Sequence, residues 1–153
     1  MSKIFLNLIQ NLNPELAHFL TIKLLKFYSK KKNLNDNPIL NQRFLGLDFS
    51  NPIGLAAGFD KNAEVINKIN FLNFGFTEVG TITPLPQYGN PKPRIFRLEK
   101  DKAIINRNGF NNLGMLEAKK KLEDFRKRCP VGSDFLVGVN IGPNRDSEDR
   151  FND

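Results

Sequence analysis

Hydrophobic and polar positions change their spacing along the chain, and from residue 51 onward the pattern predicts alternating strands and helices. Short runs rich in apolar and β-branched residues predict strands at 53–57, 77–83 and 135–141. Apolar residues at helical spacing predict helices between them, at 64–74 and 113–128. Strand, helix, strand, helix, strand with apolar strands is the βαβ pattern of a parallel sheet buried on both faces.

The first 33 residues follow a helical period instead. Residues 3–12 predict a short apolar helix. Asn13, Pro14 and Glu15 then supply an N-cap, a first-turn proline and a first-turn acid for a second helix that runs to about residue 31. On a helical wheel, apolar residues of the second helix cover an arc of roughly 240°. The arc holds Phe27, Leu20, Leu24, Ala17, Tyr28, Leu25 and Ile22, and the remaining side holds Lys26, Lys30 and Lys23.

An apolar arc this wide is unusual for a surface helix. Apolar surface flanked by lysines suits the plane of an acidic lipid headgroup region, and the alternative is a core helix with three solvated lysines. No run of 18 apolar residues exists, so no membrane-spanning helix is predicted. Residues 34–50 read as a linker with a short extended piece at 43–49, and two further extended pieces are predicted at 94–98 and 103–106.

Composition narrows the class of protein. Of 153 residues, 40% are hydrophobic and 25% are charged, which excludes disordered, collagen-like and disulfide-rich proteins. The formal net charge is +7, and +5 of it lies before Asp48, so the basic excess favours one arm on an acidic surface over nucleic-acid binding. The single cysteine, Cys129, excludes an intramolecular disulfide. With no secretory signal in the pattern, a cytoplasmic protein is expected.

Candidate chemistry gathers where the predicted strands end, because parallel sheets bind ligands at their carboxyl edge. The three ends are 57–62, 80–83 and 140–142, with small residues, neutral hydrogen-bonding side chains and Lys61. This set suits a planar ligand and an anionic group, or it is simply glycine turns with a surface lysine. The stretch 106–112 places four asparagines around Gly109, which suits an imide edge or reflects the turn preference of asparagine.

Several familiar motifs are absent from the sequence, namely the dinucleotide fingerprint, the phosphate loop, paired cysteines and clustered histidines. No metal site is therefore predicted. A flavin site needs none of these motifs.

Four long strings closely resemble the quinone-dependent, membrane-associated dihydroorotate dehydrogenases. They are NPIGLAAGFDKN (51–62), FGFTEVGTITPLPQYGNPKPRIFRL (74–98), INRNGFNNLG (105–114) and GVNIGPNRD (138–146). The likeness extends through NPELAHFLTIKLL (13–25). The resemblance implies a small two-helix domain at 1–33 that forms a quinone tunnel against the membrane. After the linker at 34–50, it implies an FMN-binding (β/α)8 TIM barrel, of which 51–153 would hold about the first three strands.

The resemblance also implies roles for individual residues. Those expected to contact FMN are Ala57, Gly58, Thr81 and Asn140. Those expected to contact dihydroorotate or orotate are Lys61, Asn106, Arg107, Asn108, Gly109 and Phe110. His18, inside the apolar arc, and Arg97 are similar to the pair that lines the quinone route. Asn108 departs from the bulkier side chain usual in the family, and the family's catalytic base is expected beyond Asp153.

The function expected from the resemblance is oxidation of dihydroorotate to orotate in pyrimidine (UMP) synthesis, with electrons passing through FMN to ubiquinone or menaquinone. The enzyme would lie peripherally on the cytoplasmic face of the cell membrane, in contact with anionic lipid. The 153 residues alone are expected to be an inactive, incomplete barrel. Two alternatives remain at this point: a soluble-type dihydroorotate dehydrogenase, and a non-catalytic truncated or split-gene product that at most binds a membrane surface.

Overall fold

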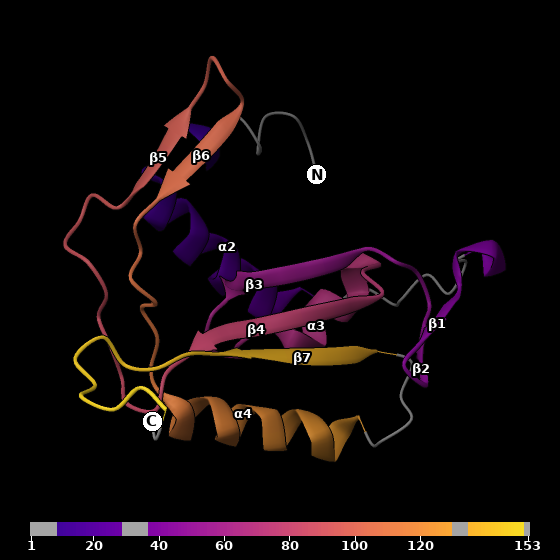
Figure 1. The fold of residues 1–153 in the computed structure, drawn as a ribbon. Coiled ribbons are helices and arrows are strands. Elements are labelled where there is room, and N and C mark those ends of the chain that lie inside the picture. The colour runs from indigo at the N-terminus through magenta and orange to yellow at the C-terminus, as the bar shows by residue number, and fades with distance from the viewer. Residues whose placement is uncertain (1–8, 29–36, 130–134, 152–153) are drawn as a thin grey trace.

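The structure is a computed structural model that describes residues 9–28, 37–129 and 135–151. Residues 3–8 of the predicted first helix, and residues 29–31 of the predicted second, lie outside the described residues. The centre is a three-stranded sheet in the order β3-β4-β7 with every pairing parallel. Its strands are β3 (Gly54–Asp60), β4 (Phe76–Ile82) and β7 (Leu136–Ile141). The predicted parallel βαβ arrangement is therefore confirmed (Figure 1).

The prediction that the first strand ends before Gly58 is wrong. β3 continues through Gly58 to Asp60, with Gly58 in the left-handed region at φ +103°. A residue without a Cβ adopts this conformation freely, so a glycine inside a strand marks an irregularity in the ladder rather than its end. The register between β3 and β4 shifts between Leu55 and Asp60, which agrees with this reason.

The helices between the strands match the predicted order. The connection from β3 to β4 holds α3 (Ile66–Ile69) and a 3₁₀ turn, η2 (Asn70–Leu72), and α4 (Met115–Arg128) precedes β7. The predicted helix at 64–74 is shorter than expected because the Asp60 carboxylate accepts hydrogen bonds from the amides of Glu64 and Val65, at 2.7 and 2.8 Å. Those bonds form a turn before α3 can begin.

One face of the sheet carries the core. Val79 and Phe135 of this face pack with Ile66, Ile69 and Phe125 of α3 and α4 in one buried cluster. Side chains alternate across a strand, and the opposite face presents Ala56, Glu78 and other exposed residues. Within the described residues the sheet is thus covered on one face only, not on both as the pattern predicts.

The amino-terminal helix α2 (Pro14–Phe27) begins as predicted, since the Asn13 side chain accepts hydrogen bonds from the amides of Glu15 and Leu16. It ends at Phe27 and not near residue 31, because Tyr28 leaves the helix in an extended conformation. Part of the apolar arc is buried, at Ala17 and Ile22. Large apolar side chains elsewhere on the helix are exposed, namely Leu16, Phe19, Leu24 and Phe27. Among the described residues, no helix is both long and apolar enough to cross a membrane.

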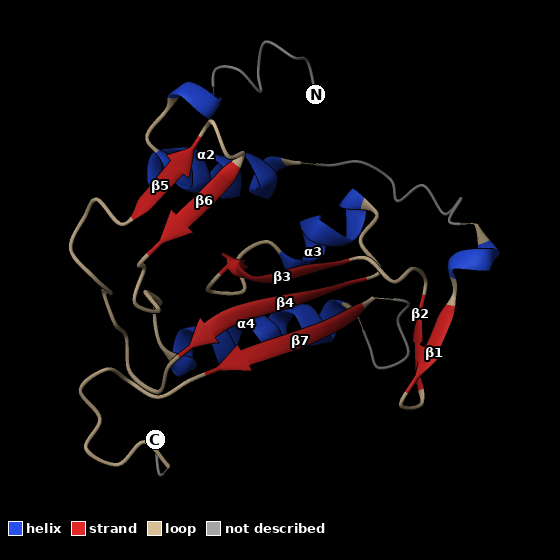
Figure 2. Ribbon diagram, turned by 45° about the horizontal axis from the view of Figure 1, so that its top comes forward, coloured by secondary structure: helices blue, strands red, loops and turns tan. Residues whose placement is uncertain are grey.

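The predicted extended pieces form two antiparallel hairpins. β1 (Gln42–Phe44) pairs with β2 (Leu47–Phe49) after a 3₁₀ turn, η1 (Pro38–Leu40), and β5 (Ile95–Leu98) pairs with β6 (Ala103–Asn106). The β1–β2 hairpin lies at the amino end of the central strands, and the β5–β6 hairpin lies beside α2 near their carboxyl end (Figure 2).

Candidate ligand site at the carboxyl edge of the sheet

The carboxyl end of β3 and the α2 helix enclose a pocket of about 370 Å³. Its lining includes His18 from α2, predicted for the quinone route, and Lys61 from the turn after β3, predicted for the substrate site, two residues 43 positions apart. The other lining residues are Asn13, Glu15, Leu16, Phe19, Ile22, Phe59, Asp60, Asn62, Glu64, Lys92 and Asn111. The pocket therefore joins the amino-terminal helix to the edge of the sheet where parallel α/β proteins bind ligands.

His18 is held against β3 by its own ring. Its Nε2 lies 2.6 Å from the Phe59 carbonyl oxygen, and its ring meets the Phe59 ring edge-on at 5.6 Å between centroids. Burial lowers the pKa of His18, and the charge of Lys61 lowers it further against the opposing effect of the hydrogen bond to Phe59. A carbonyl only accepts, so Nε2 carries the proton and Nδ1 of the neutral ring is left as an acceptor.

Lys61 is one of two lysines that line this pocket, the other being Lys92, and its side chain is only partly accessible. Burial lowers the pKa of Lys61, Glu15 opposes that change, and the charge of Arg94 adds to it. An ammonium that burial disfavours gains stability when an anionic group comes close to it. Lys61 is thus suited to holding a carboxylate ligand.

Asp60, next to Lys61, has a structural part. Its side chain is 1% exposed and both carboxylate oxygens accept backbone hydrogen bonds from the turn at 64–65. Burial raises the pKa of Asp60 despite these bonds. The carboxylate fixes the turn that carries Lys61, so a residue the sequence analysis did not single out helps to position one that it did.

The second predicted group lies at the ends of β4 and β7. Asn140 Nδ2 donates to Thr81 Oγ1 at 2.7 Å. Among the described residues the Thr81 hydroxyl donates to no partner and the Asn140 Oδ1 accepts from none, so a donor and an acceptor lie side by side. A side chain at Gly80 would collide with the Asn140 carbonyl oxygen, and only glycine lets these strands approach so closely.

On β3, space is left open beside this polar pair's edge of the sheet. Ala57 is half-buried, Gly58 is exposed, and a Cβ placed on Gly58 would meet no atom within 4 Å. Small residues over open space let a flat ligand approach the backbone. Ala57 and Gly58 thus lie within β3, and Thr81 and Asn140 lie near the carboxyl ends of β4 and β7 in the same sheet.

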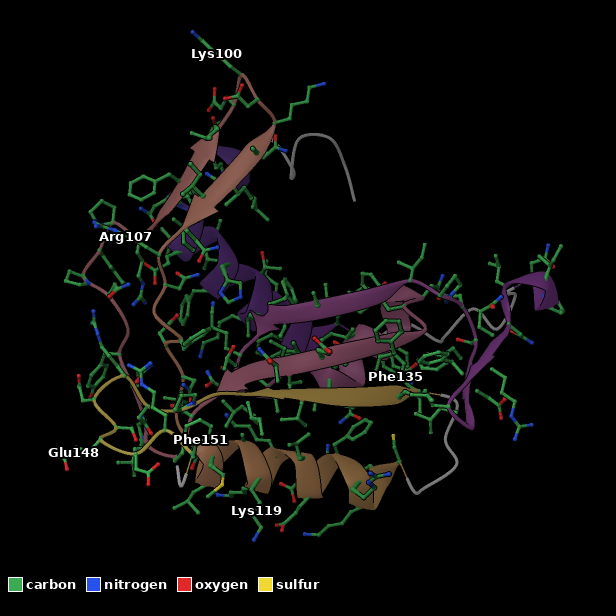
Figure 3. All side chains as sticks on the ribbon, viewed as in Figure 1. Lys100, Arg107, Lys119, Phe135, Glu148 and Phe151 are labelled. Carbon is green, nitrogen blue, oxygen red and sulfur yellow. The ribbon has the colours of Figure 1, made fainter. Side chains whose placement is uncertain are left out.

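The loop at 106–110 lies against the proline-rich loop that follows β4. Gln87 Nε2 donates to the Gly109 carbonyl at 3.0 Å, and Asn90 Nδ2 donates to the Arg107 carbonyl at 2.7 Å. Arg107 lies at the base of the β5–β6 hairpin, and Lys100 marks the hairpin's tip (Figure 3). Asn106, Asn108 and Phe110 do not line the Lys61 pocket. Asn111, which follows this loop, does line it.

Arg97, the other residue predicted for the quinone route, also does not line the pocket. Its Nη1 donates to the carbonyls of Gln10 and Leu12 at 2.8 and 2.6 Å. Arg97 therefore fastens the segment before α2 to the β5 strand.

Sequence reasoning included Asn112 in the asparagine-rich stretch 106–112 but did not single out Asn144 or Arg94, although all three side chains connect loops. Each of the three forms a hydrogen bond with a residue far away in sequence. Asn112 bonds Thr83, Asn144 bonds Leu85, and Arg94 bonds Glu15. Asn112 and Asn144 follow a glycine or proline turn, which is the one local signal they carry. The described residues contain no group of three histidine, cysteine, aspartate or glutamate side chains that could hold a metal ion.

The carboxyl end of this parallel sheet carries small residues, amide side chains and one partly buried lysine. This arrangement is typical of ligand-binding α/β proteins of the barrel or doubly wound class. The family profile described as dihydroorotate dehydrogenase matches residues 39–153. The chain therefore belongs to the dihydroorotate dehydrogenase family.

Its relatives are quinone-type enzymes by name. Dihydroorotate dehydrogenase (quinone) of Rhodopseudomonas palustris strain TIE-1 is 52% identical over 148 residues, which are 97% of this chain and 39% of the relative. The Novosphingobium aromaticivorans enzyme is 52% identical over 95% of this chain and 42% of its own length. The chain thus spans about two fifths of the length of these relatives, and the resemblance to quinone-dependent dihydroorotate dehydrogenases is confirmed.

Solved structures agree. The Eimeria tenella enzyme in complex with ferulenol has a TM-score of 0.84 and 49% identity, and it covers 92% of this chain and 38% of its own. The ligand-free Eimeria tenella enzyme gives the same TM-score and identity, with 40% of its own chain covered.

Proposed function

We propose that this chain is the amino-terminal part of a quinone-dependent dihydroorotate dehydrogenase. The enzyme oxidises dihydroorotate to orotate in pyrimidine (UMP) synthesis and passes the electrons to a membrane quinone, ubiquinone or menaquinone. The observation that carries the proposal is the pocket that joins His18 of α2 to Lys61 of the sheet edge, in a chain 52% identical to enzymes of that name.

Lys61 binds the carboxylate of the substrate in this proposal. Its half-buried ammonium has Glu15 nearby and gains from an added anion. Asn106, in the loop with Arg107, Asn108, Gly109 and Phe110, reads the imide edge of the ring through its donor and acceptor atoms. No described residue is proposed as the base that removes the substrate proton.

FMN fits the edge formed by Ala57, Gly58, Thr81 and Asn140. The open space at Gly58 admits a flat ring, and the adjacent hydroxyl donor and amide acceptor of Thr81 and Asn140 match the alternating polar edge of a flavin. Bound FMN would supply hydride acceptance and stepwise electron release. The chain's residues hold the ring, keep its polar edge hydrogen-bonded and limit the access of water.

His18 serves the quinone side. With Nε2–H donated to the Phe59 carbonyl, Nδ1 is an acceptor that can take a hydrogen bond from a hydroxyl of the quinol product. Arg97 acts on this route by holding the segment at 10–12 in place beneath α2.

The rest of the proposal concerns architecture. Residues 1–33 form a two-helix domain of the quinone tunnel, 34–50 form a linker with the β1–β2 hairpin, and 51–153 form the first strands of an FMN-binding (β/α)8 barrel. The sheet face left uncovered within the described residues, and the unpaired edges of β3 and β7, support a barrel continued by further strands.

Lys61→Ala tests the substrate site. Because this chain spans two fifths of its relatives, the test uses a full-length enzyme in which residues 1–153 are followed by the remaining part of the Rhodopseudomonas palustris relative. A lost charged hydrogen bond costs about 1.5 to 3 kcal/mol, so the dihydroorotate half-reaction should fall about ten- to a hundredfold. Quinone reduction by chemically reduced enzyme should hardly change. Equal damage to both half-reactions contradicts the assignment, and a parent enzyme without dihydroorotate oxidation contradicts the function.

Peripheral contact with the cytoplasmic face of the membrane is proposed for α2. Leu16, Phe19, Leu24 and Phe27 are exposed beside Lys23, which suits an anionic headgroup layer. Lys26 is already paired with Glu64 of the barrel segment, so it contributes less than Lys23.

Binding of the full-length enzyme to vesicles with anionic lipid tests this surface. Lys23→Glu should weaken sedimentation with the vesicles, and more than Lys26→Glu does, because each free lysine near the headgroups contributes about 1 kcal/mol. Flavin content should stay unchanged. Unaltered binding in Lys23→Glu would show that the exposed side of α2 does not meet the membrane.

A further inference from the structure

An ion pair between α2 and the loop before β5 is the most enclosed charged contact in the described residues. Arg94 is only 6% exposed, and its Nε and Nη2 donate to the same Glu15 carboxylate oxygen at 3.0 and 2.6 Å. The other Glu15 oxygen faces Lys92 Nζ at 3.6 Å. Removing one partner of a buried ion pair leaves an uncompensated charge, which strongly destabilises the folded protein. We therefore expect Glu15 and Arg94 to keep this geometry.

The remaining donors of Arg94 hold the loop after β4. Nη1 donates to the carbonyls of Tyr88 and Asn90, at 2.6 and 3.1 Å. A planar guanidinium with five donors in fixed directions can make these bonds together, which a lysine cannot. Arg94 therefore joins three parts of the chain, namely α2, the loop at 84–93 and the start of β5, which follows Arg94 directly.

The loop at 84–93 in turn carries the loop at 106–110. Asn90 donates through its side chain to the Arg107 carbonyl at 2.7 Å and through its amide to the Asn108 carbonyl at 3.0 Å. The Arg107 amide donates to the Arg94 carbonyl at 2.8 Å. A continuous set of hydrogen bonds thus runs from Glu15 through Arg94 and Asn90 to the proposed substrate loop.

Glu15 also lies in the pocket with His18 and Lys61. It stands one turn before His18 on α2, and its carboxylate attracts the Lys61 ammonium. Glu15 is therefore connected to both proposed sites. It is connected to the quinone side through α2 and to the substrate side through Lys61 and Arg94.

We propose that Glu15 and Arg94 are a positioning pair that sets α2 and the loop at 106–110 in one fixed relation, so that the dihydroorotate and quinone sites are aligned together. This rests on the proposed function. Neither residue is placed in contact with the reacting atoms, and the pair acts through His18, Lys61 and the loop.

Glu15→Gln in the full-length enzyme tests the pair. Glutamine keeps the size of the side chain and loses the charge that Arg94 needs. We expect KM for dihydroorotate to rise about tenfold and KM for quinone to rise by several-fold, with kcat changed by less than about threefold, because the sites are displaced and not dismantled. Glu15→Asp, which retains a carboxylate, should recover part of the loss. Glu15→Gln combined with Arg94→Met should cost less than the two single changes added together.

Glu117→Gln is the matched control, since Glu117 lies in the first turn of the other 14-residue helix, α4, and its partner Lys121 is 4.0 Å away. It removes the same charge from the same part of a helix dipole. It should leave both KM values unchanged.

Hydrogen–deuterium exchange supplies a readout that does not need activity. In Glu15→Gln, amides at 106–112 and 88–90 should exchange at least about tenfold faster, whereas Glu117→Gln should leave them unchanged. Unchanged exchange at 106–112, or a lower melting temperature with both KM values unaltered, overturns the inference while the function stands. A parent enzyme that oxidises no dihydroorotate overturns the proposed function, and with it the claim that the pair aligns two reaction sites.

Discussion

The two ends of the central sheet are built in different ways. At the carboxyl end, side chains bond loops that are far apart in sequence: Asn112 bonds Thr83, and Asn144 Oδ1 accepts from the Leu85 amide at 2.8 Å. At the amino end, the β1–β2 hairpin leaves Phe44 and Leu45 exposed by 65% and 85%. Among the described residues, its ion pair between Arg43 and Asp48 joins two side chains that are each about three-quarters exposed.

The two ends therefore differ in how strongly side chains of the described residues hold the loops and the hairpin in place. The buried bonds of Asn112 fix the loops of the carboxyl end, because each such bond has a specific geometry and leaves a costly unpaired group when broken. The hairpin has apolar side chains without cover among the described residues, and exposed ion pairs contribute little to stability. The loops of the candidate site are therefore held by specific side-chain bonds, whereas the described residues supply few such bonds to the hairpin.

Shifted pKa values follow the same division. Among the described residues, the groups whose pKa is shifted lie on α2 or at and just after the end of β3, namely Glu15, His18, Asp60, Lys61 and Glu64. Burial disfavours the charged form of each group, so the carboxyl end is also where charge is partly removed from water, although hydrogen bonds and nearby cations outweigh burial at Glu15 and Glu64. Such groups gather at functional sites more often than elsewhere.

The largest expected effect is from Asn112→Ala at the carboxyl end. Asn112 Oδ1 accepts from the amides of Thr83 and Gly114, and its Nδ2 donates to Thr83 Oγ1 and the Phe110 carbonyl. Losing these bonds and leaving buried partners unsatisfied should lower the free energy of unfolding of the full-length enzyme by about 3 kcal/mol. The measurement is the urea midpoint, together with the affinity for dihydroorotate, which should also fall.

The matched control makes the same substitution at the other end of the sheet. Asn37 caps the 3₁₀ turn before β1 with a single bond to the Ile39 amide at 3.1 Å, in an exposed position. Asn37→Ala should therefore cost at most about 1 kcal/mol. Equal losses at Asn37 and Asn112 would refute the contrast between the two ends.

A smaller effect is expected from pH, and again at one end only. The pKa of His18 is lowered below its ordinary value of 6.5 in the folded protein, so the unfolded chain binds the proton more readily. The stability of the His18 contact is complete above about pH 6.5 and declines as pH falls toward the lower folded pKa. Protection from hydrogen exchange, measured against the intrinsic rate at each pH, should fall at α2 and at 59–65 when the pH is lowered from 7 to 5.5. Protection of the β1–β2 hairpin should change little.

His18→Gln separates this titration from that of the carboxylates. Glutamine can still donate to the Phe59 carbonyl but does not titrate, so protection at α2 should lose its dependence on pH in this range. The pKa of Glu15 is lowered from 4.5 because Arg94 and Lys92 outweigh burial, and its contribution disappears only at more acid pH. A pH response that persists in His18→Gln would assign the effect to another group.

The strands, their order and most element bounds followed from the sequence because burial imposes a spacing on apolar residues. β4 lies within one residue of its prediction at each end, and α4 begins two residues late. The misses have local causes: Asp60 shortens the helix after β3, Tyr28 ends α2 early, and Gly58 lets β3 continue. Each depends on a single side-chain bond or backbone angle, which periodicity does not record.

For the candidate site, the sequence by itself determined which residues are candidates: Lys61, His18, Thr81 and Asn140 are predicted from residue type, strand ends and family motif. Only the tertiary structure decided which of them meet. It brought His18 to Lys61 across 43 residues, left the loop at 106–110 outside their pocket, and joined Glu15 to Arg94 across 79 residues. The physical reason is that spacing along a chain encodes which face is buried, whereas a hydrogen bond between distant residues depends on where packing places both ends of it.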